Sequence, residues 1–282
     1  MAHATVAASP EPVTRSLETT KATLVWSADG RTVTKSPTSF WDDPVLGSGK
    51  RIFRNEQRMA RMLEAARPPV PVARLHGATT RRSISFEAID GEPLGPKYPT
   101  ALTPGDVADM VQLVTRLSTY QPRRRWFRRF PVERRLHLHE AEGLLTAGDV
   151  SVVRSVLTQT SPRMRFAHAD ITARNVLRDR TGKLVLIDWE WAGLYPESYE
   201  LAFLWFSVID VPDARAEVEK EVGETKRASF VLSALFVQLL HLHMWMGREP
   251  TPFIRAHEAT KAALLAELRL LAGGSAERPT RR

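Results

Sequence analysis

The feature that most constrains this sequence is the segment His168-Ala169-Asp170-Ile171-Thr172-Ala173-Arg174-Asn175, followed by an apolar run that ends at Asp188. A histidine, an aspartate two residues later and an asparagine five residues after that form a rare pattern. The chain contains 8 His, 12 Asp and 2 Asn residues, so chance produces this spacing in about a few of every thousand such chains. The Thr181-Gly182 turn predicts a hairpin that returns Asp188 to the loop.

These residue types suit phosphoryl transfer, in which the protein mainly positions the reactants and neutralises charge. Asp170 can orient a hydroxyl group and take its proton. The Asn175 amide and the Asp188 carboxylate offer the oxygen ligands that Mg²⁺ prefers. The alternative, an aspartate capping a turn and a solvated aspartate after a strand, does not explain why the three residues occur in this spacing.

Together with its flanks, the segment resembles a known family. Phe166 to Leu177, followed by Leu186-Ile187-Asp188-Trp189-Glu190, is similar to the aminoglycoside phosphotransferase and choline kinase family of small-molecule kinases. The resemblance covers about Lys21 to Trp205. It implies a protein-kinase-like fold with ATP and Mg²⁺ as cofactors.

The resemblance also implies roles for individual residues. Lys35 would contact the ATP phosphates while Glu56, in the following helix, holds its ammonium group. The Glu87 carbonyl and the Ile89 amide would bind the adenine edge. By this resemblance the site comprises Asp170 as catalytic base, Asn175 and Asp188 as metal ligands, Lys35, Glu56, Glu87 and Ile89 at the nucleotide, and Glu190 at the acceptor.

The pattern of elements predicts an α+β, bilobal fold. A small antiparallel sheet with one helix precedes a larger, mainly helical lobe. The Asp29-Gly30 turn between two β-rich runs predicts a hairpin, and Thr103-Pro104 predicts a helix start. The expected strands are 22–26, 32–35, 72–75, 83–88, 165–167, 175–177 and 184–187; the expected helices are 51–66, 103–120, 132–145, 150–157, 199–208, 212–222, 228–246 and 252–271.

The same pattern predicts how the chain divides. We expect a disordered N-terminus over 1–14, an N-lobe and hinge for nucleotide binding over 15–91, a C-lobe for catalysis and acceptor binding over 92–272, and a flexible tail over 273–282.

The sequence departs from the family pattern in places. No Gly-x-Gly-x-x-Gly loop precedes the first hairpin, where the chain has Ser16 to Lys21, and this leaves GTP open as the donor. Tyr199-Glu200-Leu201-Ala202 stands where the family has Asp-Leu-Ala. Glu200 could still accept backbone hydrogen bonds from the catalytic loop. An Ala-Pro-Glu anchor is missing, which disfavours a protein substrate.

Composition excludes several other classes. Cysteine is absent, so disulfides and thiolate chemistry are impossible, and a reducing cytoplasm is favoured. The net charge is +8, and the basic-aromatic run 123–135 could contact nucleic acid phosphates. A solvated surface is the favoured interpretation. The apolar stretch Phe230 to Met246 contains polar residues and predicts a core helix, with no membrane partner.

Two further groups have competing interpretations. The pairs His137/His139 and His241/His243 have a spacing that points to different helix faces, which disfavours a metal site. Trp189 and Trp191 either line a substrate pocket or pack the cleft floor.

The acceptor is expected to be a small molecule with a free hydroxyl. An antibiotic, aminoglycoside-type or another natural product, is the leading hypothesis, and it implies resistance. A polycation would need the acidic residues Glu190, Glu197, Glu200, Asp210 and Asp213 near the site, whereas the basic surface leaves a neutral or anionic acceptor open. The alternatives are a metabolic kinase for choline, a sugar or a hydroxy amino acid, and a non-catalytic kinase-fold binding module.

Overall fold

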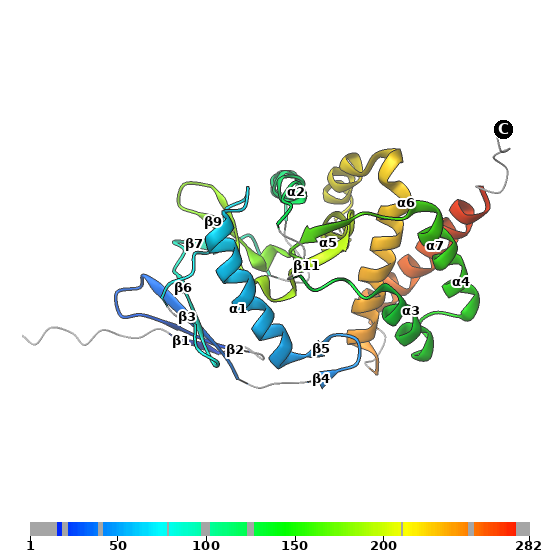
Figure 1. Cartoon of the computed structure of the whole chain (residues 1–282). Coiled ribbons are helices and arrows are strands. Elements are labelled where there is room, and N and C mark those ends of the chain that lie inside the picture. The colour runs from blue at the N-terminus through cyan, green and yellow to red at the C-terminus, as the bar shows by residue number, and fades with distance from the viewer. Residues whose placement is uncertain are drawn as a thin grey trace, which may run out of the picture.

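A small antiparallel sheet lies at one end of the molecule and a group of helices at the other (Figure 1). This computed structural model describes residues 16–18, 22–38, 42–77, 79–96, 102–122, 127–209, 211–247 and 251–274. The sheet has the order β1-β2-β3-β6. Its strands are β1 (Ser16–Glu18), β2 (Ala22–Trp26), β3 (Thr32–Pro37) and β6 (Ile84–Glu87). The α+β fold with a small antiparallel sheet and a helical part is confirmed.

The first predicted hairpin forms as expected. β2 and β3 pair antiparallel with Leu24 opposite Lys35. Gly30 takes the left-handed conformation (φ 68°) that the turn requires, and its amide donates to the Ser27 carbonyl at 2.9 Å. The register places Lys35 near the end of its strand, beside the helix that follows.

That helix is α1 (Gly49–Ala66), which packs an apolar face between the sheet and the helical part (Figure 1). Phe53, Met59 and Leu63 on this face are buried. Two short strands, β4 (Asp42–Asp43) and β5 (Gly47–Ser48), precede α1 in a stretch for which the sequence predicts only a loop.

The predicted strand Val72–Leu75 is wrong. Val72 and Leu75 form only isolated bridges, with Leu186 and Phe86 respectively. Pro71 and its neighbour Pro69 lack the amide hydrogen that a continuous ladder needs, so this stretch crosses between the lobes without joining a sheet.

The helical part contains α2 (Pro104–Ser118), α3 (Val132–Ala141), α4 (Ala147–Thr160), α5 (Tyr199–Ser207), α6 (Pro212–Trp245) and α7 (Pro252–Gly274). A capping box of Thr103 and Asp106 starts α2. Every residue of α5 is buried, mainly against α6. The predicted gap between two helices, 223–227, shrinks to a single non-helical residue, Gly223 (φ 56°).

Two small sheets complete this part. β7 (Gly91–Pro93), β9 (Val176–Asp179) and β10 (Leu184–Leu186) have the order β10-β9-β7. β8 (Met164–Ala167) pairs with β11 (Gly193–Pro196). In the second predicted hairpin, Val176 lies opposite Leu186, so the residues just before β9 and just after β10 are neighbours.

Within the described part of the chain, one helix, α6, is long and apolar enough to cross a membrane, but 72% of that apolar window is buried inside the protein. This is the behaviour of a core helix, as the sequence predicts. The predictions for residues 1–14, for 275–282 and for the start of the basic run, 123–126, lie outside the described residues.

Candidate active site

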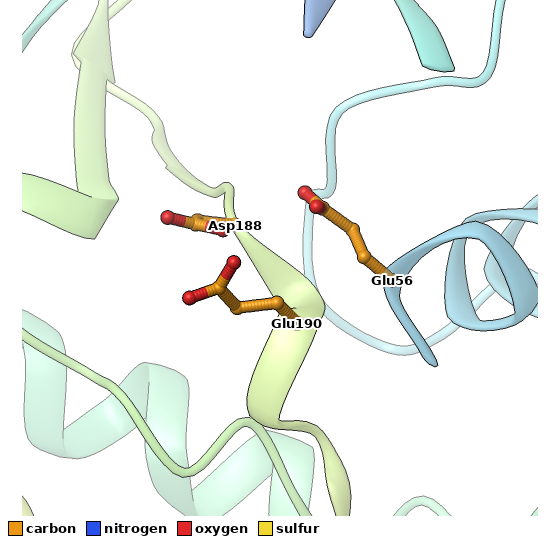
Figure 2. Close-up of side chains that lie close together, drawn as sticks. All are labelled: Glu56, Asp188 and Glu190. Atoms are coloured by element: carbon orange, nitrogen blue, oxygen red, sulfur yellow. The ribbon is translucent and has the colours of Figure 1, made fainter. Parts of the chain in front are cut away.

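Lys35 binds three carboxylates between the sheet and the helical part. Its Nζ lies 2.9 Å from Glu56 Oε2, 2.7 Å from Asp188 Oδ1 and 3.4 Å from Glu190 Oε2. Figure 2 shows Glu56 reaching from α1 toward Asp188 and Glu190, which leave one segment of the helical part. The predicted contact of Lys35 with Glu56 is present, and Asp188 and Glu190 join it.

Charge and burial oppose each other in this Lys35 cluster. Burial disfavours an ammonium group, but Asp188, Glu56 and Glu190 raise the pKa of Lys35 well above its usual range. Burial, together with the charges of Asp188 and Glu190, raises the pKa of Glu56 to about 8 although Lys35 opposes the shift. One ammonium group thus serves three carboxylates, and the cluster retains an excess of negative charge.

The catalytic loop lies beside this cluster and orients Asp170 through Asn175. The Asn175 side-chain amide donates to the Asp170 carbonyl at 2.9 Å and to Asp170 Oδ2 at 2.8 Å. Since the Asn175 nitrogen serves Asp170, its side-chain oxygen is the atom that can face a cation. The Asn175 carbonyl accepts the Ile187 amide at 3.1 Å, which places the loop next to Asp188.

His168 forms hydrogen bonds both with the catalytic loop and with the residue before Asp188. Its Nε2 donates to the Ile187 carbonyl at 2.8 Å, and the Asp170 amide donates to its Nδ1 at 3.3 Å. Burial lowers the pKa of His168, so the neutral ring with a proton on Nε2 satisfies both contacts. The histidine of the motif therefore joins the loop to the segment that leads to Asp188.

Glu200 supports the loop from the opposite side. Its Oε1 accepts the Ala169 amide at 2.6 Å. Ala169 has φ 64°, an unfavourable conformation for a residue with a Cβ, and the hydrogen bond stabilises it. This contact confirms the expectation that Glu200 accepts a backbone hydrogen bond from the catalytic loop. Burial raises the pKa of Glu200 to about 7.

Asn55 is a structural contributor that the sequence does not reveal. This buried residue of α1 donates to the carbonyls of Glu190 at 3.0 Å and Ala192 at 2.9 Å. It joins the helix that carries Glu56 to the segment that carries Asp188. Its neighbours Glu56 and Gln57 are polar and buried as well, so the local sequence does not single out Asn55.

The two tryptophans after Asp188 differ in environment. Trp189 is 3% exposed and its Nε1 donates to the Leu186 carbonyl at 3.3 Å, so it packs the cleft floor. Trp191 is half-buried and faces Arg128, whose Cζ lies 5.8 Å from the ring centre.

The predicted hinge residues lie at the exit of β6. The Glu87 amide donates to Arg74 at 2.9 Å, and the Ile89 carbonyl accepts the Gly91 amide at 3.1 Å. The side chains of Glu87 and Ile89 line a cavity of about 670 Å³ that contains none of the catalytic-loop residues. Their predicted backbone contacts with adenine stay a prediction, as does the contact of Glu190 with an acceptor.

The donor chemistry of the site suits a hard cation. In the described part of the chain, Glu56, Asp188 and Glu190 are the only group of three histidines or carboxylates whose ligand atoms, all within 4.8 Å of one another, could hold a metal ion. Carboxylate and amide oxygens, including those of Asp188 and Asn175, are the ligands that Mg²⁺ accepts.

A small sheet bearing a lysine bound to a helix glutamate, set over a loop with an aspartate and an asparagine, defines a protein-kinase-like phosphotransferase. The family profile described as the phosphotransferase enzyme family (APH) matches residues 46–230 of this chain. The chain belongs to this family, whose members transfer phosphoryl groups to hydroxyls.

Solved structures share the fold at low sequence identity. A choline/ethanolamine kinase family protein from Mesorhizobium loti is 18% identical, with a TM-score of 0.62 and coverage of 95% of this chain and 90% of its own. Choline kinase LicA from Streptococcus pneumoniae is 13% identical, with a TM-score of 0.61 and coverage of 90% and 94%.

Aminoglycoside phosphotransferases are similarly close. A thermostable mutant of APH(4)-Ia, in a ternary complex with ADP and hygromycin B, is 12% identical, with a TM-score of 0.62 and coverage of 90% of this chain and 93% of its own. No curated protein sequence matches this chain.

Proposed function

We propose that this phosphotransferase uses ATP and Mg²⁺ to phosphorylate a hydroxyl group of a small molecule. The observation that carries the proposal is the contact of Lys35 with both Glu56 and Asp188, beside a loop in which Asn175 orients Asp170. These contacts support the proposal because a lysine, an aspartate and an asparagine of this kind are the protein groups that phosphoryl transfer uses. Nucleotide complexes of relatives with this fold, such as the ADP complex above, support a purine nucleotide as the donor.

In this proposal Asp170 accepts the proton of the acceptor hydroxyl. The hydroxyl oxygen forms a bond to the γ-phosphorus of ATP, while the bond between that phosphorus and the β-phosphate oxygen breaks. Lys35 contacts the phosphates and Glu56 holds it. Asn175 and Asp188 would hold Mg²⁺, which neutralises phosphate charge when bound. Residues 15–91 would bind the nucleotide through the Glu87 carbonyl and the Ile89 amide, and residues 92–272 would carry catalysis and the acceptor.

An isosteric substitution tests the role of Asp170. Asp170→Asn keeps the contact with Asn175 but removes the proton acceptor, so kcat should fall by about 10²–10⁴. Thermal stabilisation by ATP and Mg²⁺ should persist. Asp213→Asn, an exposed substitution on α6, is the matched control. Unchanged turnover in Asp170→Asn would exclude Asp170 as the base.

An antibiotic is the leading acceptor class, in keeping with the aminoglycoside phosphotransferases that share the fold. A neutral or anionic metabolite is the second candidate, and a specific observation favours it. Of the acidic residues expected around a polycation, Glu190 binds Lys35 and Glu200 holds the Ala169 amide, while Glu197 and Asp213 are exposed on separate elements. Asp210 lies outside the described residues.

A screen of ATP consumption separates these candidates. The wild type and Asp170→Asn should be compared across aminoglycosides, other hydroxylated antibiotics, choline, sugars and hydroxy acids. Turnover that depends on Asp170 identifies the acceptor class, and the position of the phosphate on the product identifies the hydroxyl. Nucleotide binding without turnover of any acceptor would favour a binding module.

A further inference from the structure

Arg135 on α3 is a buried cation without a hydrogen-bonding partner for two of its nitrogens. The residue is 6% exposed, and its Nε and Nη1 contact no acceptor within the described residues. The ring of Phe130 has its centre 5.8 Å from the Arg135 Cζ. Burial lowers the pKa of Arg135, yet arginine does not lose its proton in proteins. A buried guanidinium group normally has an anion or a set of acceptors beside it.

Three other arginines surround the same small cavity. Arg51, Arg128 and Arg134 line it together with Arg135, and its volume is about 20 Å³. Arg128 donates to the Leu46 carbonyl at 3.3 Å and Arg134 to the Pro44 carbonyl at 3.0 Å. We call this cavity the Arg135 pocket.

No carboxylate forms a direct ion pair with these arginines in the described part of the chain, although the charge of Asp43 acts on Arg135 from a distance. The neighbouring Asp43 instead accepts the Val45 and Leu46 amides and contacts His243 at 3.1 Å.

The N-terminus of α1 adds positive potential to the Arg135 pocket. Gly47 and Ser48, the residues just before this helix of 18 residues, line the cavity. The Ser48 side chain makes no capping hydrogen bond, and the first turn contains no acidic residue. Free amide groups at a helix N-terminus attract anions. The buried guanidinium group of Arg135 and this helix end therefore favour the same kind of ligand.

The Arg135 pocket lies beside the segment that follows Glu190. Arg128 faces Trp191, which follows Glu190 in the chain, and the Arg128 carbonyl accepts the Leu194 amide at 2.7 Å. α1 contacts the same segment through Asn55. A cavity of this size has room for about one water-sized group. One oxygen of an anionic group would therefore enter it beside Arg135, and the rest of the ligand would lie outside.

We propose that the Arg135 pocket binds an oxyanion, a carboxylate or a phosphate, and that the acceptor molecule supplies this group. The second half of the proposal rests on the proposed kinase function. Guanidinium groups bind both anions through paired hydrogen bonds. The acceptor class is then a hydroxylated anion, such as a hydroxy acid or a sugar phosphate, and not a polycation.

The oxyanion site is tested first without an acceptor. Thermal unfolding of the full chain is followed while inorganic phosphate or acetate replaces chloride at constant ionic strength. Arg135→Met fills a similar volume without a charge, and Arg128→Gln changes a half-buried member of the pocket. Arg116→Gln, an exposed substitution on α2, is the control. Phosphate should raise the Tm of the wild type and the control, and the affinity should fall about 30-fold or more in Arg135→Met.

A nucleotide site that also binds phosphate would respond equally in the wild type and in Arg135→Met, so the difference between them belongs to the pocket. An equal response in both proteins overturns the proposal. If Arg135→Met does not fold, the phosphate response of Arg128→Gln is compared with that of the wild type instead. An equal response in these two proteins then overturns the proposal.

The second arm identifies the source of the anion. Turnover of hydroxy acids and sugar phosphates is compared with that of their neutral counterparts. Arg135→Met should raise the KM of the anionic acceptor about 30-fold or more and leave the KM of ATP unchanged. An unchanged acceptor KM, with the phosphate response lost, overturns the acceptor assignment and leaves a site for a separate anion. Absence of turnover for every acceptor contradicts the kinase function, while the phosphate arm still decides the pocket.

Discussion

Neutralising Glu200 should change how the stability of the protein depends on pH. This carboxyl is buried, accepts the Ala169 amide at 2.6 Å, and has a pKa raised by burial from 4.5 to about 7. Below pH 4.5 it is protonated in both the folded and the unfolded protein. As pH rises toward 7, the unfolded chain releases this proton before the folded one does, so stability falls. Above pH 7 the stability falls no further, because Glu200 is then ionised in both the folded and the unfolded protein.

The size of the effect follows from the pKa difference between the folded and unfolded protein. The shift in the pKa of Glu200 from 4.5 to about 7 corresponds to about 3 kcal/mol in the free energy of unfolding. About 2–3 kcal/mol of this develops between pH 5 and pH 8. Glu200→Gln removes the titration and retains an oxygen for the Ala169 amide. The variant should therefore gain about 2–3 kcal/mol relative to the wild type on going from pH 5 to pH 8.

Urea unfolding, followed by circular dichroism at several pH values, measures this difference. Glu197→Gln, an exposed substitution three residues away, should show no such gain. A constant difference between Glu200→Gln and the wild type across the whole range would refute the reasoning. It would mean that Glu200 is ionised in the folded protein throughout, with its charge balanced by the catalytic loop.

Two further substitutions probe close contacts around the segment that follows Asp188. Asn55→Ala leaves two buried carbonyls without a donor, and it should cost about 1–3 kcal/mol per carbonyl in urea unfolding and also lower kcat. Normal stability with intact turnover would show that water replaces the amide. Gly193→Ala would place a Cβ 2.5 Å from the Arg128 carbonyl oxygen, whereas Gly273→Ala meets open space. The first should lower stability by about 1–3 kcal/mol; equal Tm values for the two variants would contradict this close approach.

The residues proposed for nucleotide binding and those proposed for catalysis are held in place in different ways. Lys35, Glu56 and Asp188 come from β3, α1 and the segment after β10, so their contact requires that the sheet and the helical part close on each other. Asp170 and Asn175 come from one loop and keep their geometry through local hydrogen bonds. Movement of the lobes would therefore alter the proposed nucleotide contacts while leaving the position of the proposed base within its loop unchanged.

Local features of the sequence predicted much of the fold. The Asp29-Gly30 turn and the Thr181-Gly182 turn each form the expected hairpin, because the conformations that such turns need favour few residue types. Thr103 begins its helix as predicted. The motif residues Asp170 and Asn175 lie in hydrogen-bonding contact because five residues of one short loop separate them.

Other features depend on residues far apart in the chain, and only the tertiary structure decided them. Glu190 meets Lys35 across 155 residues, and Asn55 meets Ala192 across 137. The burial of Arg135, in a run interpreted as a solvated surface, likewise depends on packing against the segment before α1. Periodicity and turn chemistry act over a few residues, whereas these contacts follow from how the two lobes pack. The sequence alone therefore determined the two hairpins, the approximate positions of the helices and the loop motif, and the packing of the lobes decided which charges meet.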